Sequence, residues 1–259
     1  MLLLADIGNT LVKWAVSPSS GIVRAVAASG HAGAAPMLRR LARRHSPTAL
    51  AVASVVPKVA RELSILARRC VPEVTHLDYR LFKTIMDIAV VPRMAPGADR
   101  LANAMALSTL CPLPACSVDA GTAITIEVVD AEHRFIGGAI MPGSRLQFQA
   151  LATGTAQLGC VAALPSSARA FGTTTASAIA AGVHVGIPGA VSAIIAGVER
   201  QLGRTLARIV ITGGTGPALW SSLRLDWPCA TLDPLLTFRG MAAAWHALAR
   251  PHGALRRKP

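Results

Sequence analysis

The residues best suited to chemistry lie in two short phrases of the same form. The first is Asp6-Ile7-Gly8-Asn9-Thr10, and the second is Asp119-Ala120-Gly121-Thr122-Ala123. The glycine of each phrase lets the backbone turn sharply and approach an anion. The Asn and Thr side chains offer donors for phosphate oxygens, and an aspartate can hold Mg²⁺ directly or through water. The pair of phrases therefore indicates nucleotide phosphate chemistry, with a phosphotransferase as the first hypothesis.

Each phrase needs a strand on either side to hold its turn. Four apolar, strand-like runs supply them, at residues 2–5, 11–16, 115–118 and 123–129. For one copy alone, an ordinary hairpin turn is an equally simple interpretation, but the second copy argues against it. Lys13, three residues beyond Thr10, can add a point charge toward the phosphates. The repeat predicts two like domains that face each other across a nucleotide.

Gly97-Ala98-Asp99-Arg100 begins a predicted helix over residues 97–110. An aspartate at a helix start is often only a cap. Its functional interpretation is a general base beside an anion-binding arginine, which takes a proton from a hydroxyl that attacks a γ-phosphate. The residues alone leave both interpretations open.

A glycine-rich loop, Thr212-Gly213-Gly214-Thr215-Gly216, follows a predicted buried strand over residues 208–211. Such a loop would let an adenosine ring lie on bare backbone, although a plain turn explains it equally well. None of the seven histidines falls in these motifs, so a Ser-His-Asp or metal-histidine site has no support. We interpret His184 and His246 as packing or surface residues.

The composition is that of a folded α/β chain. Hydrophobic residues make up 52% and charged residues 15% of the 259 positions, which is ample for buried cores and too little charge for disorder. We predict helices over 35–45, 58–69, 97–110 and 239–249, and strands over 49–53, 74–77, 115–119, 122–129, 133–140 and 208–211. Pro112 and Pro114 interrupt the pattern, so we place a domain boundary near residues 108–114. The expected domains are 1–111 and 112–259.

The net charge of +13 is the main compositional extreme. It could attract anions such as ATP or nucleic acid, but we favour a solvated basic surface. The basic clusters lack interleaved aromatic residues, which a single-strand binding platform needs. They are Arg39-Arg40, Arg43-Arg44, Arg68-Arg69 and Arg256-Arg257-Lys258. The first two are predicted to lie on the wet face of the 35–45 helix, and the last belongs to a loose tail.

The five cysteines show no paired spacing and an odd count, so we expect neither a zinc site nor a disulfide framework. We interpret them as buried apolar thiols in a reducing cytosol. The N-terminus lacks a secretory signal pattern. The longest apolar stretch, residues 176–198, contains several glycines and Pro188. We interpret it as two buried helical pieces, not as a membrane span.

Taken together, these motifs resemble the type III pantothenate kinase family of the acetate and sugar kinase/Hsc70/actin superfamily. The resemblance runs along nearly the whole chain. Besides the two phosphate phrases, the Gly-Ala-Asp-Arg motif and the glycine-rich loop, three further segments match in order. They are Ser54-Val55-Val56-Pro57, Gly137-Gly138-x-x-x-Pro142-Gly143 and Phe171-Gly172-x-x-Thr175.

The resemblance implies an α/β fold of two similar ribonuclease H-like domains, the actin-like ATPase duplication, with a nucleotide cleft between them. It implies ATP-dependent phosphorylation of pantothenate to 4′-phosphopantothenate, the first step toward coenzyme A. It further implies Mg²⁺, a monovalent cation (K⁺ or NH₄⁺) and a homodimer. From the residues themselves we expect a cytoplasmic location and no membrane partner, and we do not favour a nucleic-acid partner.

The resemblance also assigns roles to residues. Asp99 would be the catalytic base, and Asp119 would hold the monovalent cation. Asp6 would hold Mg²⁺ through water. The substrate would be bound by Gly97, Ala98, Asp99, Arg100 and Thr175. ATP and its phosphates would be bound by Asp6, Ile7, Gly8, Asn9, Thr10, Leu11, Val12, Lys13, Thr122, Gly213 and Gly214.

Two departures from the family pattern fall on the pantothenate side. The family usually has a tyrosine seven residues before the glycine of Gly-Ala-Asp-Arg, with a proline between them. Here that position is Val90, the nearby proline is Pro92, and the sole tyrosine, Tyr79, lies too far upstream to replace it. Thr174 stands where the family usually has an asparagine before Thr175.

Two other functions remain open. One is a non-catalytic, kinase-like regulator that binds a partner or DNA, which the charge of +13 and the altered substrate segment motivate. Binding to DNA of that kind would weaken steeply with salt. The other is a kinase of the same superfamily that acts on another small alcohol.

Overall fold

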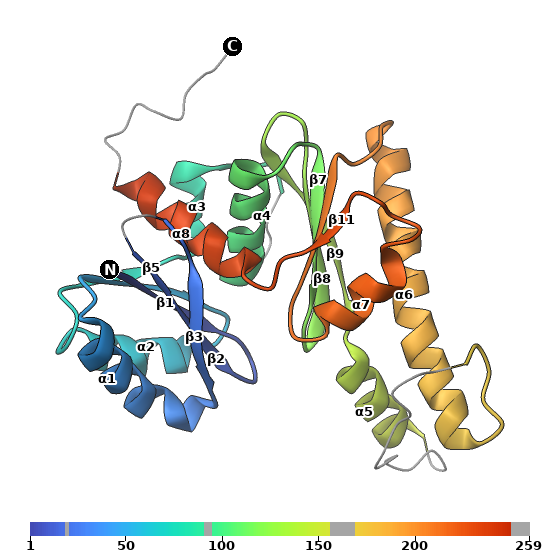
Figure 1. The fold of residues 1–259 in the computed structure, drawn as a ribbon, viewed down its shortest axis with the longest axis horizontal. Helices are drawn as coiled ribbons and strands as arrows, with labels where there is room; N and C mark the ends of the chain where they lie inside the picture. Colours follow the sequence, from blue (N-terminus) through green and yellow to red (C-terminus); the bar gives the residue numbers. More distant parts are fainter. Residues whose placement is uncertain (19–20, 91–94, 156–168, 250–259) are drawn as a thin grey trace. The chain divides into compact units, whose positions relative to one another are not determined.

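The computed structural model describes residues 1–18, 21–90, 95–155 and 169–249 (Figure 1). The chain is α/β with two sheets. The first sheet has the order β3 (Arg24–Ser29), β2 (Val12–Ser17), β1 (Leu2–Ile7), β4 (Ala49–Ser54), β5 (Glu73–His76). The second has the order β11 (Ala230–Leu232), β10 (Arg208–Thr212), β7 (Ala115–Ala120), β8 (Ala123–Val129), β9 (Arg134–Pro142), β6 (Asp87–Ile88).

The two sheets repeat one strand order. Across the first sheet the strands lie in the order β3, β2, β1, β4, β5. Across the second sheet the five strands from β7 to β11 lie in the order β9, β8, β7, β10, β11, which is the same arrangement when the strands of each sheet are numbered along the chain. In the first sheet β1 pairs antiparallel with β2 and parallel with β4. The duplication predicted from the two phosphate phrases is therefore confirmed at the level of whole sheets, with β6 added beside β9.

The helices are α1 (Ala34–His45), α2 (Pro57–Ala67), α3 (Tyr79–Ile85), α4 (Ala98–Leu110), α5 (Ser144–Gly154), α6 (Thr175–Leu202), α7 (Gly216–Leu223) and α8 (Leu236–Leu248), with a short 3-10 turn at His31–Gly33. The chain forms two compact units. The first unit contains residues 1–115 and 127–137 and the segment from Leu235 onward, and the second contains 116–126 and 138–234. The chain thus passes between the units four times, and helix α8 belongs to the first unit.

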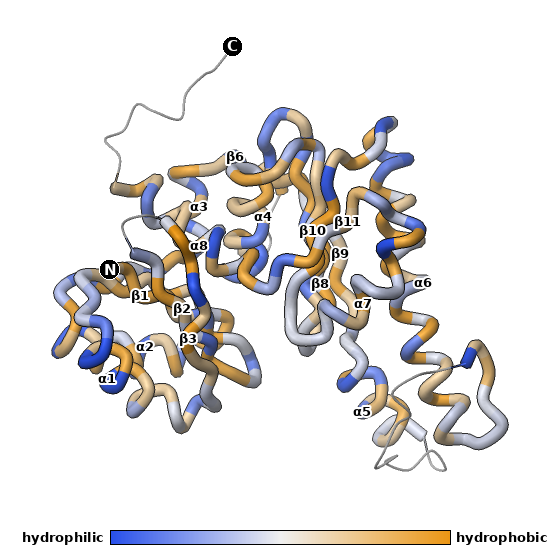
Figure 2. Tube along the Cα trace, in the orientation of Figure 1, coloured by the Kyte–Doolittle hydropathy of each residue, from blue (hydrophilic) through white to orange (hydrophobic). Residues whose placement is uncertain are grey.

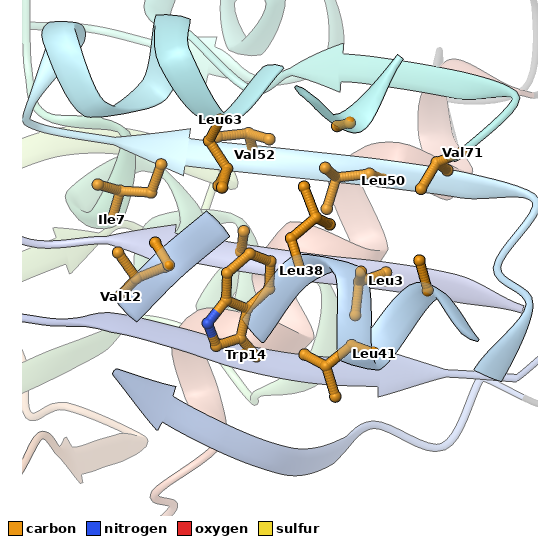
Figure 3. Close-up of a cluster of buried hydrophobic side chains, with 14 of the residues drawn as sticks. Leu3, Ile7, Val12, Trp14, Leu38, Leu41, Leu50, Val52, Leu63 and Val71 are labelled. Carbon is orange, nitrogen blue, oxygen red and sulfur yellow. The ribbon is translucent and has the colours of Figure 1, made fainter. Parts of the chain in front are cut away.

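The core of the first unit lies between its sheet and helices α1 and α2 (Figure 3). Trp14, Leu3 and Leu50 project from the strands and are fully buried. Leu38 and Leu41 cover them from α1, while the arginines of that helix are exposed (Figure 2). The apolar positions repeat at helical spacing, so the predicted wet face of this helix is confirmed.

One prediction about the helices is wrong. The apolar stretch over 176–198 is part of a single helix, α6, with Pro188 inside it, and not two pieces. Its buried residues Val183, Ile187, Val191 and Ile195 keep a four-residue spacing across the proline. That continuous buried stripe outweighs the one backbone hydrogen bond that a proline removes. By length and composition α6 could cross a membrane, which is weak evidence for a single helix; 33% of its most apolar window is buried, so the expected burial holds for only a part of the helix.

The prediction that the cysteines are buried thiols is confirmed only for Cys116. Cys70 is exposed, and Cys111 and Cys229 are half-buried; all four are free. Cys70 follows the last turn of α2, where the chain reverses at the surface. Partial burial still raises the pKa of the Cys229 thiol above its ordinary value. Cys160, Pro92 and the basic tail lie outside the described residues.

Helix α8 holds helix α4 by direct backbone packing within the first unit. A Cβ atom at Gly240 would overlap the carbonyl group of Ala102. Beside this contact, the Thr237 hydroxyl donates to Oδ1 of Asn103 at 2.8 Å, and Asn103 is fully buried. Since α4 begins with the Gly-Ala-Asp-Arg motif, α8 fixes the helix that presents that motif.

We expect Gly240→Ala to destabilise the protein by about 1–3 kcal/mol, the usual range for forcing extra volume into a packed contact. Urea denaturation measures this difference. Gly182→Ala is the control, because a Cβ there meets no atom within 4 Å and the site is also helical. That control should be more stable by about 0.5–1 kcal/mol. An equally stable Gly240→Ala would show that the two helices can separate at no cost.

Candidate active site

The first phosphate phrase forms the turn between β1 and β2. The Gly8 amide donates to the Leu11 carbonyl at 3.0 Å, which closes the turn. Asp6 is half-buried near the end of β1 and lies opposite Lys13 in the antiparallel register. Of the remaining predicted ATP residues here, Asn9, Thr10, Leu11 and Lys13 are exposed, whereas the side chains of Ile7 and Val12 are fully buried. Only the backbone of those two residues can meet a ligand.

A histidine supports this turn from outside the motif. Nε2 of His31 lies 2.8 Å from the Gly8 carbonyl oxygen. Because a carbonyl only accepts, Nε2 is the donor. The two residues are 23 positions apart, and His31 belongs to the short turn that precedes α1. Sequence reasoning missed this contact, since no local pattern links a histidine to a loop that distant.

The second phosphate phrase forms the turn between β7 and β8 in the same way. The Gly121 amide donates to the Ala123 carbonyl at 3.0 Å. Only Gly121 and Thr122 separate the two strands, so this turn is tighter than the first. A connection of two residues joins neighbouring strands in antiparallel fashion. Asp119 and Thr122 are both half-buried.

Two other loops of the second unit pack directly on this turn. The Gly143 amide donates to the Thr122 carbonyl at 3.0 Å, and a Cβ atom at Gly143 would overlap the carbonyl oxygen of Gly121. Gly213 has a φ of +90°, and a Cβ there would stand 2.5 Å from both the Ala120 carbonyl oxygen and Oδ1 of Asp119. Any larger residue at Gly143 or Gly213 would collide with the turn. The backbone of both loops therefore packs directly against the backbone of the turn that carries Asp119, the predicted ligand of the monovalent cation.

The glycine-rich loop is also tied to the turn by its threonine. Both the amide and the hydroxyl of Thr215 donate to the Ala120 carbonyl, each at 2.9 Å. The structure therefore brings Asp119, Thr122 and Gly213 together in one cluster. Gly214 faces open space, since a Cβ there would meet nothing within 4 Å. That bare backbone fits the predicted role of a surface on which a flat ring can lie.

A cavity of about 520 Å³ adjoins this cluster within the second unit. Ala120 and Thr215 form one wall, and α6 and α7 form the others. His184 lies on the α6 wall and packs edge-on against Phe148, with ring centroids 6.1 Å apart. The remaining lining residues are Ile124, Ser144, Val183, Val185, Ile187, Pro188, Ala218, Leu219 and Ser222. A mainly apolar cavity with a few hydroxyl groups is the common form of a small-ligand site.

In the first unit, the Gly-Ala-Asp-Arg motif lies at the first turn of α4. Gly97 is the N-cap residue, and Oδ1 of Asp99 accepts the amide of Arg100 at 2.8 Å. A Cβ on Gly97 would stand 2.5 Å from that oxygen and 3.2 Å from Cγ1 of Val55. The Ser-Val-Val-Pro segment therefore packs against the motif. Asp99 is half-buried, so one carboxylate serves the helix start and also reaches the surface.

Arg100 is held by a carboxylate that sequence reasoning did not single out. Its Nε atom lies 2.9 Å from Oε1 of Glu127, on β8. The guanidinium carbon also lies 5.8 Å from the centroid of the Phe135 ring, on β9. The side chain of Glu127 is fully buried, and that of Arg100 is 17% exposed. An ion pair in this setting has a defined geometry, unlike an exposed pair.

The Thr174–Thr175 pair lies at the start of α6 in the second unit. The Thr174 hydroxyl accepts the Ser177 amide at 3.2 Å, and the Ser177 hydroxyl accepts the Thr174 amide at 3.0 Å. This reciprocal pair is a capping box. Thr175 is the first helical residue and is exposed. The threonine that replaces the family asparagine therefore works as a helix cap.

The donor set fits a metal that arrives with a nucleotide. Mg²⁺ is usually bound by one or two carboxylates together with phosphate oxygens and waters. Within the described ranges, no group of three or more His, Cys, Asp or Glu side chains could form a metal site by itself. A single carboxylate such as Asp6, beside a turn built for an anion, matches that requirement.

Comparison with known proteins agrees with this geometry. The family model of type III pantothenate kinase matches residues 2–197. The type III pantothenate kinase of Halorhodospira halophila is 36% identical over 252 residues, which cover 91% of this chain and 96% of that protein. The chain belongs to the type III pantothenate kinase family.

Solved structures show the fold. A Baf family protein from Campylobacter jejuni has a TM-score of 0.61 at 21% identity, covering 95% of this chain and 98% of its own. The activator of 2-hydroxyisocaproyl-CoA dehydratase from Clostridium difficile, with bound ADPNP, has a TM-score of 0.56 at 13% identity, covering 96% of each chain. The fold is the two-sheet α/β duplication of the actin-like ATPases, as the resemblance implied.

Val90, where the family has tyrosine, is half-buried in the first unit. The Ala89 amide donates to the Phe135 carbonyl at 3.0 Å, which fastens this segment to β9. Cγ1 of Val90 lies 3.6 Å from the point that a Cβ on Gly137 would occupy. The departure from the family pattern therefore falls next to the residue on which Arg100 packs.

We expect His31→Ala to weaken nucleotide affinity about two- to tenfold, because a hydrogen bond that holds a loop contributes about 0.5–1.5 kcal/mol. Isothermal titration with ATP and Mg²⁺ measures this. His45→Ala, at the opposite end of α1, is the matched control and should bind normally. Equal affinities of His31→Ala and His45→Ala for ATP would show that His31 does not contribute to nucleotide binding.

Proposed function

We propose that the protein phosphorylates pantothenate with ATP to give 4′-phosphopantothenate. The observation that carries this proposal is the start of α4, where Asp99 reaches the surface and Arg100 is held by a buried carboxylate. A base beside a cation is what a kinase needs to accept a hydroxy acid. In a chain of this family, that pair favours pantothenate over another small alcohol.

Asp99 acts as the general base. It takes the proton of the pantothenate hydroxyl as that oxygen forms a bond to the γ-phosphorus, and the bond to the ADP oxygen breaks. Oδ1 already accepts the Arg100 amide, so we assign the proton to Oδ2. As the family relationship implies, we assign substrate binding to Gly97, Ala98, Arg100 and Thr175.

Each unit has its own phosphate turn. The first offers the backbone of residues 6–13 with the Thr10 hydroxyl and the Lys13 ammonium, and the second offers Thr122. We assign adenosine to Gly213, Gly214 and the 520 Å³ cavity, because that cavity is mainly apolar and Thr215, the next residue of the glycine-rich loop, lines it. Mg²⁺, when bound, would neutralise charge on the phosphates, with Asp6 holding it through water.

Asp119 is the proposed ligand of a monovalent cation, K⁺ or NH₄⁺. Its Oδ1 and the Ala120 carbonyl oxygen each lie 2.5 Å from the point that a Cβ on Gly213 would occupy, so the two oxygens are neighbours. Carbonyl and carboxylate oxygens suit such cations. By the same family relationship we propose a homodimer in the cytoplasm.

Asp99→Asn should lose turnover by a factor on the order of 10²–10⁴, because it removes a general base while preserving shape. ADP release in the presence of pantothenate measures the rate, and titration with ATP tests the fold. Asp78→Asn is the matched control: Asp78 caps α3, where its carboxylate accepts the Leu81 amide at 2.9 Å. Since asparagine caps equally well, this control should remain active. Full activity in Asp99→Asn would refute the base assignment.

Turnover should depend on K⁺. We expect pantothenate-dependent ADP release in K⁺ buffer, a clear fall in Na⁺ buffer, and little difference between the two buffers for Asp119→Asn. Equal rates of the unaltered protein in K⁺ and Na⁺ would remove the cation from the proposal. Absence of turnover with ATP still bound would favour a regulator or another alcohol substrate.

A further inference from the structure

Glu127 is an unusual residue for its position. It lies in β8 between Ile126 and Val128, and its side chain is fully buried. An ionised carboxylate loses its hydration when buried, so such a residue needs a cationic or hydrogen-bonding partner. No phosphate or glycine motif accounts for it. Because burying a carboxylate costs free energy of folding, we look for a role of Glu127 in the neighbouring candidate site.

The partner of Glu127 is the proposed substrate-binding arginine. Oε1 of Glu127 accepts Nε–H of Arg100 at 2.9 Å, and the Phe135 ring lies under the guanidinium group. A guanidinium is a rigid planar fork of five donors. Fixing it through Nε and through its face therefore fixes the direction of its terminal nitrogens as well.

We propose that Glu127 is a positioning residue: it orients Arg100 to receive the carboxylate of pantothenate. This inference rests on the proposed function. An arginine that is already ordered loses less conformational freedom when the substrate binds. Glu127 thus acts on substrate affinity through Arg100, and it has no direct part in the transfer of the phosphoryl group.

A purely structural role is the competing explanation, since the pair also joins α4 to β8. The two roles differ in what they change. A structural contact alters stability and affects both substrates alike. A positioning contact alters the KM for pantothenate, leaves the KM for ATP in place, and has no effect once Arg100 is gone.

The test is a double-mutant cycle on the full chain. Glu127→Gln should raise the KM for pantothenate about tenfold, because it removes the negative charge that strengthens the hydrogen bond to Arg100, with the KM for ATP within about twofold. In an Arg100→Ala background the same change should have no further effect on the KM. An unchanged KM for pantothenate, or an equal rise in both KM values, overturns the inference.

Asp130→Asn is the matched control. Asp130 is also a nearly buried carboxylate paired with an arginine, since its Oδ2 accepts Nε of Arg134 at 2.8 Å. That pair lies at the far end of β8, beyond Glu127 in the chain. Its loss should lower stability without changing the KM for pantothenate.

A spectroscopic measurement separates this inference from the proposed function. The Nε–H of Arg100 should give a slowly exchanging ¹H–¹⁵N signal that Arg100→Lys removes, that Glu127→Gln shifts or broadens, and that Asp130→Asn leaves in place. Absence of a protected signal overturns the positioning role even in an active kinase. A protected signal in a protein that neither binds nor phosphorylates pantothenate overturns the proposed function, and with it the substrate named here, while the pairing stands.

Discussion

The functional loops depend on one physical constraint, the close packing of backbone against backbone where a side chain is absent. A Cβ at Gly143 or Gly213 would collide with the second phosphate turn, and a Cβ at Gly97 would collide with the carboxylate of Asp99. Gly240 applies the same constraint one step further away, where α8 meets the helix that starts with the motif. The positions of short side chains such as Asp99, Asp119 and Thr122 depend largely on how closely these loops approach, whereas the longer Arg100 is held by its ion pair with Glu127.

The parts that could be predicted from sequence are those whose cause is local. The two phosphate turns were predictable because each lies between two apolar strands and has a glycine at its bend, although a Cβ at Gly8 or Gly121 would make only ordinary contacts. The repeat of the turns then predicted the repeat of the sheets, which share one strand order. Helix α1 was predictable because its buried leucines and exposed arginines alternate at helical spacing. In each case a short window contains both the signal and its reason.

The parts that could not be predicted depend on residues far apart in the chain. His31 meets Gly8 across 23 positions, and Glu127 meets Arg100 across 27. Strand β6 has only two residues, so no periodicity could reveal it; its pairing with β9 defines it. Pro188 suggested a helix break because the sequence does not show which residues are buried on either side of it.

The pantothenate side of the site combines both kinds of information. The change to Thr174 is explained locally, because a threonine caps α6 with Ser177. Val90 is different: it stands where the family usually has a tyrosine, in the segment that the Ala89 amide fastens to the Phe135 carbonyl. Binding energy that a tyrosine would supply there must come from other contacts. An arginine whose direction is already set by Glu127 can supply more of it than a freely rotating one, because less order is lost on binding. If Arg100 binds pantothenate as proposed, the buried ion pair would therefore offset part of what the change from tyrosine to Val90 removes.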